Sequence, residues 1–204
     1  MKTLKLRITM KPLFFLLTLT LLASCAESVT RQAANLPGFE IIKISGTEFS
    51  RAVKKDPDSG QVVEEGELYQ GKLSGTWVKY DESKQTVQTI STFVDGLRNG
   101  LYLEFNNQGK ISKQARYAND KLDGLMVEYN RNTRKQKEAS YKNGQLHGIY
   151  REFNDAGKMN KEIQYKEGKQ DGYMRYYNED GTKTVEYIFK NGEKVSGGAV
   201  LPAG

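Results

Sequence analysis

Cysteine and histidine are almost absent from this chain of 204 residues, which contains one of each, Cys25 and His147. A single cysteine excludes a disulfide within the chain and any zinc site built from several cysteines. A single histidine removes the multi-histidine metal sites and the usual Ser-His-Asp arrangement. Sustained apolar recurrence at three and four residues is also lacking after Cys25, so helices are not expected. The chain is instead rich in glycine, with 20, and tyrosine, with 12, which favours turns and strands.

One long apolar run occurs, over residues 13–23, and it follows a start that is basic and free of acidic residues. Eleven uncharged residues are too few to span a bilayer, which takes about 20. A basic start, a short apolar run and a boundary of small residues are typical of an export signal. We expect residues 1–24 to be this signal, with Met1 or Met10 as the start.

The end of the run, Leu22-Ala23-Ser24-Cys25, resembles the bacterial lipobox. The resemblance implies cleavage before Cys25, a diacylglycerol thioether on Cys25, and acylation of its new amino group. Two or more acyl chains hold a protein stably on a membrane, whereas one chain anchors only marginally. The alternative is an ordinary secretory signal cut near Ser24 or Ala26. The expected localisation is the bacterial cell envelope, at the outer membrane or, in an organism with one membrane, the plasma membrane.

The export signal also changes the charge balance. Residues 1–24 hold four of the 31 basic residues, so the remainder has 27 basic and 25 acidic residues and a net charge of +2. Such a balance provides no strong field for nucleic acid, and no nucleic-acid partner is expected.

The rest of the chain repeats with a period of about 24 residues. Glycines recur at fixed spacing, an aromatic residue follows each glycine by five positions, and a second aromatic series keeps a step of 24. The glycines are Gly75, Gly100, Gly124, Gly148 and Gly172, and the second aromatic series is Phe93, Tyr117, Tyr141, Tyr165 and Phe189. Each unit reads as a short strand, a polar turn and a return strand, which is a β-hairpin. The predicted fold is all-β, an elongated single-layer antiparallel sheet built from tandem hairpins.

This pattern resembles the MORN (membrane occupation and recognition nexus) repeat in its bacterial variant, over about residues 66–197. The matching motifs include Gly100-Leu101-Tyr102 through Phe105, Tyr141 to Gly144, and Gly148-Ile149-Tyr150 through Phe153. The resemblance implies a row of antiparallel hairpins in one twisted sheet, and bacterial members are often described as antitoxin-like. Two departures affect turns, namely Asp120 in place of a glycine and a turn at Asn132-Thr133-Arg134 that lacks one.

The repeats define the expected organisation of the exported chain. Residues 25–37 form the lipidated cysteine and a polar tether, residues 38–65 a degenerate capping hairpin, and residues 198–204 a disordered tail. Within the cap, Phe39 to Ile44 and Gln61 to Tyr69 read as strands and Asp56 to Gly60 as a turn. Side chains one, three and five residues after each glycine share one face and are mostly apolar, so Phe105 and Phe153 are expected to be core. Aromatic residues of one column are expected to stack across neighbouring hairpins.

The other face supplies a candidate recognition surface, because aromatic and arginine side chains dominate binding hot spots. Its candidate residues are Trp77, Tyr102, Tyr150, Arg175 and Tyr176. No catalytic residue, metal ligand or cofactor site is predicted. His147 occupies a slot that holds ordinary turn residues in other repeats, and the glutamates Glu104, Glu128, Glu152 and Glu138, Glu162, Glu186 read as solvated ladders rather than acid–base pairs.

These observations favour a non-enzymatic module that is tethered to a membrane through Cys25 and presents its sheet to an unidentified protein partner. The name of the antitoxin-like relatives suggests a neutralising or immunity role, by analogy. The alternative is a binder of envelope polymer or lipid headgroups. The low net charge disfavours strong binding to anionic lipid.

Overall fold

The computed structural model describes residues 36–83 and 86–200. The chain divides into residues 1–31 and residues 32–204, and every described residue belongs to the second unit. The predicted export signal, the lipidation site at Cys25 and most of the predicted tether lie outside the described residues. Within the described ranges, no helix has the length and apolar character of a membrane span.

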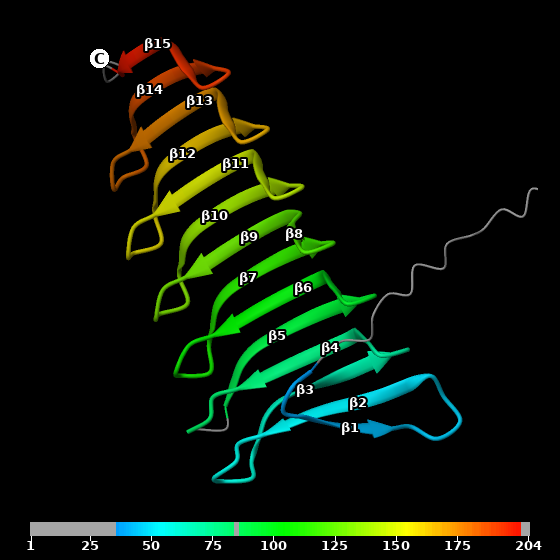
Figure 1. The fold of residues 1–204 in the computed structure, drawn as a ribbon. Helices are drawn as coiled ribbons and strands as arrows, with labels where there is room; N and C mark the ends of the chain where they lie inside the picture. Colours follow the sequence, from blue (N-terminus) through cyan, green and yellow to red (C-terminus); the bar gives the residue numbers. More distant parts are fainter. Residues whose placement is uncertain (1–35, 84–85, 201–204) are drawn as a thin grey trace, which may run out of the picture. The chain divides into compact units, whose positions relative to one another are not determined.

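Fifteen strands form one open antiparallel sheet, in which neighbours along the chain are neighbours in space (Figure 1). This arrangement confirms the predicted all-β, single-layer sheet of tandem hairpins. The strands are β1 (Phe39–Lys43), β2 (Phe49–Lys55), β3 (Val62–Tyr69), β4 (Lys72–Tyr80), β5 (Val87–Val94), β6 (Leu97–Phe105), β7 (Ile111–Ala118), β8 (Lys121–Leu122), β9 (Gly124–Tyr129), β10 (Lys135–Lys142), β11 (Gln145–Phe153), β12 (Met159–Lys166), β13 (Lys169–Tyr177), β14 (Lys183–Lys190) and β15 (Glu193–Ala199).

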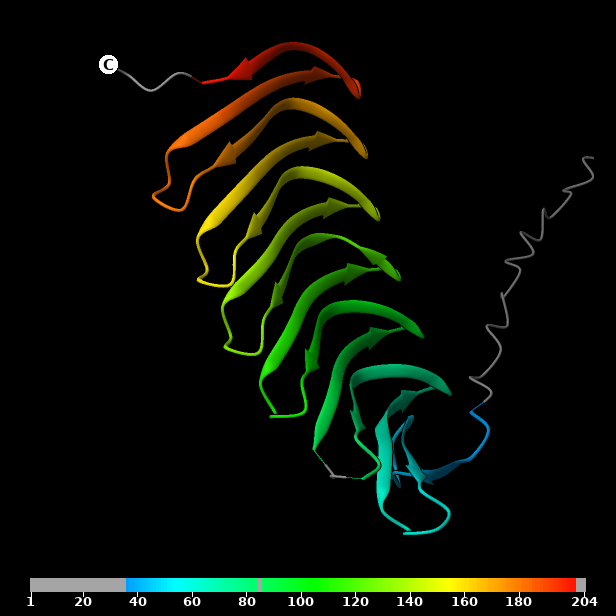
Figure 2. The ribbon, with the colours of Figure 1, turned by 90° about the vertical axis from the view of Figure 1, so that its left-hand side faces the viewer.

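The repeated glycine marks the place where each forward strand bends. Gly148 has a φ of 104° and lies opposite Tyr165, and strand β11 pairs with its two neighbours in registers that shift along its length. Glycine adopts such a backbone without the Cβ clash that other residues suffer. Figure 2 shows the resulting arch, repeated from strand to strand along the sheet.

The polar turns after β6, β9 and β11 follow one design, because an asparagine folds its side chain back onto each turn. In the turn from β11 to β12, Asn154 Oδ1 accepts hydrogen bonds from the amides of Ala156, at 3.1 Å, and Lys158, at 2.9 Å. Gly157 closes the turn with a φ of 81°. The amide of Gly157 donates to Asn154 O at 2.8 Å. In the turn that lacks glycine, Thr133 takes the glycine position with a φ of 61°, and its amide donates the corresponding hydrogen bond to Asn130 O at 2.9 Å. The fold is thus retained at this departure.

The other departure, Asp120, also keeps the glycine-like backbone, with a φ of 64°. Its carboxylate accepts hydrogen bonds from the amide and the Nε of Arg98, at 3.0 and 3.1 Å. The following forward strand is divided into β8 and β9, and both pieces pair with β7. The irregularity is therefore local, as the sequence predicted.

The N-terminal cap contains one strand more than the sequence predicted. Strand β2 pairs with both β1 and β3, so residues 39–69 form three strands rather than one hairpin. The sheet curls at this end, as a contact between strands that are not neighbours shows. The ring centroids of Phe39 on β1 and Trp77 on β4 lie 5.8 Å apart. Ala52, Leu68 and Trp77 are buried together there, with Leu36, Phe39, Leu73 and Phe93 against them.

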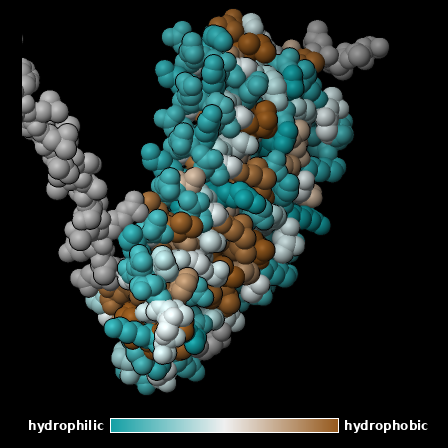
Figure 3. Space-filling view, turned by 90° about the vertical axis from the view of Figure 1, so that its right-hand side faces the viewer, coloured by the Kyte–Doolittle hydropathy of each residue, from teal (hydrophilic) through white to brown (hydrophobic). Residues whose placement is uncertain are grey.

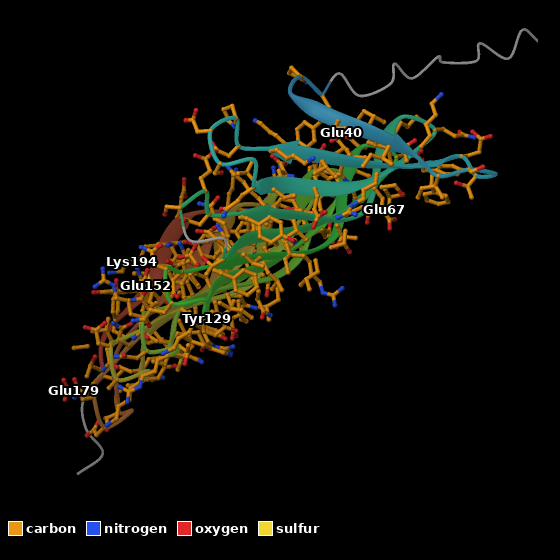
Figure 4. The ribbon with its side chains drawn as sticks, turned by 90° about the horizontal axis from the view of Figure 1, so that it is seen from below. Glu40, Glu67, Tyr129, Glu152, Glu179 and Lys194 are labelled. Atoms are coloured by element: carbon orange, nitrogen blue, oxygen red, sulfur yellow. The ribbon has the colours of Figure 1, made fainter. Side chains whose placement is uncertain are left out.

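A second buried cluster lies along the middle of the sheet and identifies its more buried side. Ala115, Met126 and Ala139 form it, with Tyr102, Tyr117, Leu122, Tyr141, Leu146 and Tyr150 packed against it. We call this side the tyrosine face. The other side, the arginine face, carries Leu101, Leu103, Arg116, Arg151 and Arg175. Figure 4 shows side chains projecting from both sides of the single layer.

The predicted core position of Phe105 and Phe153 is wrong. Both side chains are half-buried on the arginine face, whereas the fully buried residues of the middle repeats lie mostly on the tyrosine face. The reason is the size of the cross-strand neighbours. Tyr102 lies opposite Ala115, and Tyr150 lies opposite Ala139. Because these neighbours are small, the two rings pack down against the buried cluster that contains the alanines.

The last strand, β15, pairs with β14 only and ends the sheet. It extends to Ala199, so Gly198 and Ala199, which were expected to begin the disordered tail, belong to a strand. Residues 201–204 lie outside the described residues.

Candidate interaction surface

Tyr102 and Tyr150 occupy the same repeat position on β6 and β11 and have matching surroundings. Each ring meets a tyrosine of the return strand edge-on, Tyr117 at 5.9 Å and Tyr165 at 6.1 Å between centroids. Such edge-to-face pairs contribute roughly 0.5–1.5 kcal/mol beyond the burial of their area. The contacts join two different columns, so the predicted stacking within a single aromatic column is wrong.

The two phenol groups are hydrogen-bond donors to glutamates two residues further along. Tyr102 Oη donates to Glu104 at 3.2 Å, and Tyr150 Oη donates to Glu152 at 2.6 Å. Burial, followed by the charge of Glu104 and this hydrogen bond, raises the pKa of Tyr102 to about 12. Burial and the hydrogen bond to Glu152 raise the pKa of Tyr150 as well. The proton of each phenol is therefore engaged by a glutamate of the same strand.

Trp77, the third aromatic residue at this repeat position, is not on the surface. Its side chain is buried, with 4% of the residue exposed, and its Nε1 donates to Glu67 O at 3.0 Å. The ring lies between Phe39 and Phe93, because the curled N-terminal strands cover it. The prediction that Trp77 contributes to a recognition surface is therefore wrong.

Arg175 and Tyr176 are neighbours in sequence and point to opposite sides of β13, as successive strand residues must. Tyr176 lies on the tyrosine face, with Lys161 Nζ 5.8 Å from its ring centroid. Arg175 lies on the arginine face, where its Nε donates to Glu186 at 2.5 Å. The predicted grouping of these two residues on one surface is wrong.

A row of alternating charges accompanies the tyrosines. Lys113 lies opposite Glu104 and Glu128, and Lys161 lies opposite Glu152. Lys113 Nζ is 3.6 Å from Glu128, and Lys161 Nζ is 3.6 Å from Glu152. These partly exposed pairs confirm the predicted first glutamate ladder, and their signs alternate so that the row has no large net field.

The second glutamate ladder differs from its prediction, because Glu162 is buried, with 6% of the residue exposed. Arg151 joins Glu138 at 2.9 Å and Glu162 at 2.7 Å, while Arg175 approaches Glu162 at 3.9 Å. Hydrogen bonding to Lys135, with further help from Arg151 and against the effect of burial, lowers the pKa of Glu138. This is an internally neutralised row rather than a solvated ladder.

Sequence reasoning missed Arg151, and it placed Arg175 on the candidate recognition surface rather than in this row. Arg151 and Arg175 stand three residues after the repeat glycine, where earlier repeats have Leu103 and Val127. At this position the residues change from apolar to basic, and glutamates lie opposite on the return strands. This change was the signal in the sequence that could have predicted the ion pairs.

His147 lies in the turn-flanking slot predicted for it, where its Nδ1 faces the amide of Glu167 at 3.5 Å. Across residues 36–83 and 86–200, no group of three His, Cys, Asp or Glu side chains could hold a metal ion. A cavity of about 740 Å³ lies beside the turn from β6 to β7 and is lined mostly by amide and hydroxyl side chains, with Glu104 and Arg131 as its charged residues.

No protein-family model matches the chain, and no curated protein matches it. Solved structures similar to it include TarM, at a TM-score of 0.27 and 15% identity over 63% of this chain and 20% of that one. A mutant of S. aureus TarM in complex with fondaparinux, alpha-GlcNAc-glycerol and UDP has a TM-score of 0.21 and 11% identity, over 78% of this chain and 21% of that one. The GtfA/B complex bound to UDP and GlcNAc has a TM-score of 0.19 and 11% identity, over 78% and 25%. The chain spans about a fifth to a quarter of these proteins.

Proposed function

We propose that this protein is an exported, lipid-anchored and non-enzymatic interaction module that binds a protein partner through its tyrosine face. The observation that carries the proposal is that the tyrosines of this face, from β6 to β14, are both ordered and partly exposed. They are ordered by edge-on pairs and hydrogen bonds, yet they remain partly exposed because the sheet is a single layer. Tyrosines held in this way add contact area at low entropic cost when a partner binds.

The charge row favours a partner with a defined pattern of its own. Lys137 lies with its Nζ 5.5 Å from the ring centroid of Tyr150 and stands opposite Glu128 and Glu152. A row of alternating signs gives little long-range attraction but penalises a partner whose charges do not match. Selective recognition of one protein is the function that such a surface serves best.

The proposed lipid anchor and the proposed localisation rest on the sequence around Cys25, which resembles a lipobox. Acyl chains on Cys25 would hold the protein on a membrane of the bacterial cell envelope. Intact-mass measurement of the mature protein tests this part, since it distinguishes a triacylated Cys25 from a free thiol. The resemblance to bacterial MORN repeats, and through it to antitoxin-like proteins, adds an immunity role by analogy.

Binding rather than catalysis agrees with the state of the ionisable groups on the sheet. The phenols of Tyr102 and Tyr150 donate to Glu104 and Glu152, and the buried carboxylate of Glu162 is paired with Arg151. A general acid or base needs a group that can exchange its proton near the working pH. These groups instead form hydrogen bonds and an ion pair within the sheet.

Affinity capture with the full-length lipidated protein from a detergent extract of the envelope tests the proposed surface. We expect one stoichiometric protein partner that is lost with the charge reversal Lys137→Glu on the tyrosine face. Arg116→Glu on the exposed arginine face is the matched control and should retain the partner. Loss of the partner with Arg116→Glu but not with Lys137→Glu would refute the choice of face.

The alternative is a binder of envelope polymer on the same face. It is favoured by the regular recurrence of the tyrosines, one set per hairpin and about 10 Å apart, which suits a ligand that also repeats. Retention on purified envelope glycan, reduced by Tyr141→Ala and without any protein partner, would support this alternative over the first.

A further inference from the structure

The long edge of the sheet made by the turns between one hairpin and the next changes character along its length. We call it the linking edge, and Figure 3 views the molecule from its side. Its N-terminal end carries large apolar side chains that are 39–51% exposed. They are Ile44, Phe49, Tyr69, Val94 and Leu97, and together they are termed the apolar end. In Figure 3, apolar residues gather in the lower, N-terminal half, and hydrophilic residues dominate above.

The same repeat positions hold lysines further along the edge. Val94 pairs with Leu97 across one turn, whereas two repeats later Lys142 pairs with Gln145, and after another repeat Lys166 pairs with Lys169. All four of these later residues are exposed. Since the backbone is the same in each repeat, the apolar end reflects a choice of side chains and not a demand of the fold.

Contacts between neighbouring turns hold the apolar end together as a continuous patch. The rings of Phe49 and Tyr69, from neighbouring turns, lie 5.0 Å apart, and the amide of Gly96 donates to Leu73 O of the turn before it at 2.9 Å. Lys72, which pairs with Tyr69 across its turn, forms an ion pair with Asp95 at 3.3 Å, next to Val94. The ammonium of Lys72 within the patch is therefore neutralised. Exposed apolar patches of this kind mark interaction sites.

The segment that joins Cys25 to the sheet limits how far the N-terminal strands can lie from the lipid. Leu36 follows Cys25 by eleven positions in the sequence, and such a segment reaches at most about 40 Å. The sheet from β1 to β15 extends about 60 Å at the usual spacing between strands. Lipid on Cys25 therefore keeps the N-terminal strands near the bilayer, while β15 is free to stand away from it.

We propose that the apolar end of the linking edge rests in the interfacial region of the bilayer that holds Cys25, so that the protein is seated on the membrane and not merely tethered to it. This inference rests on the proposed lipid anchor. The seat works by burying apolar side chains and does not need anionic lipid, because Lys72, the basic residue between Tyr69 and Val94, is paired with Asp95. It orients the sheet with its lysine-rich end and much of the tyrosine face away from the membrane and open to a partner.

A fluorescent label on the linking edge tests the seat. The full-length lipidated protein with Leu97→Cys is labelled with an environment-sensitive maleimide dye and reconstituted into phosphatidylcholine vesicles. Gln145→Cys is the matched control, because it has the same repeat position two repeats later and is exposed. In the vesicles, we expect the emission at position 97 to be blue-shifted and several-fold stronger than the emission of the same dye at position 145. Phe49→Cys supplies a second reporter from another strand.

The outcomes separate the seat from the anchor on which it rests. The protein without an added cysteine must take up no dye if Cys25 is lipidated, and uptake there would refute the anchor and the seat together. With the anchor present, emission at positions 49 and 97 no stronger than the emission at position 145 would refute the seat alone. A rise that requires added envelope protein and not vesicles would make the apolar end a protein interface and would also refute the proposal.

Discussion

Gly66 lies directly beneath the indole of Trp77, and a Cβ on Gly66 would overlap the ring. The backbone of Gly66 is extended and does not need glycine, so the residue is there to leave room for the ring. The equivalent positions, on the strands before Tyr102 and Tyr150, hold the small residues Ser91 and Ala139. The pairing of a large side chain with a small cross-strand neighbour therefore sets the packing of the tyrosine face.

Gly66→Ala should destabilise the protein by about 2 kcal/mol, because overpacking displaces the indole and weakens the N-terminal cap. Gly198→Ala is the control, since it lies in a strand with open space around its Cβ position. Urea unfolding at pH 7 measures both variants. Equal midpoints for the two would show that the indole does not depend on the missing side chain.

Thr133→Gly should stabilise the protein by about 1 kcal/mol. Thr133 has a φ of 61°, which strains a β-branched residue, whereas the corresponding Gly157 has the same turn without strain. Part of this gain is offset by the greater freedom of glycine in the unfolded chain. The reciprocal variant Gly157→Thr should be destabilising. A less stable Thr133→Gly protein in thermal unfolding would contradict this account of the turn.

Arg151→Leu should destabilise the protein by about 2 kcal/mol, since Glu162 then loses its nearest cation while it remains buried. The loss stays below that of a fully buried pair, because the Arg151 side chain is partly exposed and Arg175 is still near. Adding Glu162→Leu should recover most of the stability, as Val78, Ile90 and Leu103 form an apolar row at these positions earlier in the sheet. A double variant as unstable as the single one would show that the charges are needed for more than mutual neutralisation.

The pH dependence of stability should carry the signature of Glu138 and Glu186. Hydrogen bonds from Lys135 and Arg175, respectively, lower the pKa of these carboxyls below the value near 4.3 of an unfolded chain. A lowered pKa means that the stabilisation is present above the unfolded value and is lost as the pH falls through the folded one. Urea midpoints between pH 2 and 6 should therefore fall toward acid, and Glu138→Gln should flatten the curve. A slope that is unchanged in this variant would refute its contribution.

The fold could be predicted because each repeat encodes it locally, in a glycine at the bend, an asparagine or aspartate in the turn, and alternation along the strands. The more buried face could not, because alternation alone does not say which side has small cross-strand neighbours. Burial of Trp77 depends on the curl of β1 onto β4, a long-range contact that no periodic pattern contains. The separation of Arg175 from Tyr176 was available from alternation alone, and position counting from Gly172 would have found it.

Side-chain footprinting with hydroxyl radicals tests the central claim most directly, since it reports each face of a single-layer sheet separately. The anchored protein is compared with and without its captured partner, at Tyr141, Tyr150 and Tyr165 on one face and at Leu101 and Leu125 on the other. We predict that the partner protects the three tyrosines and leaves the two leucines as reactive as before. Protection of the leucines with unchanged tyrosines would contradict the assignment of the tyrosine face as the binding surface.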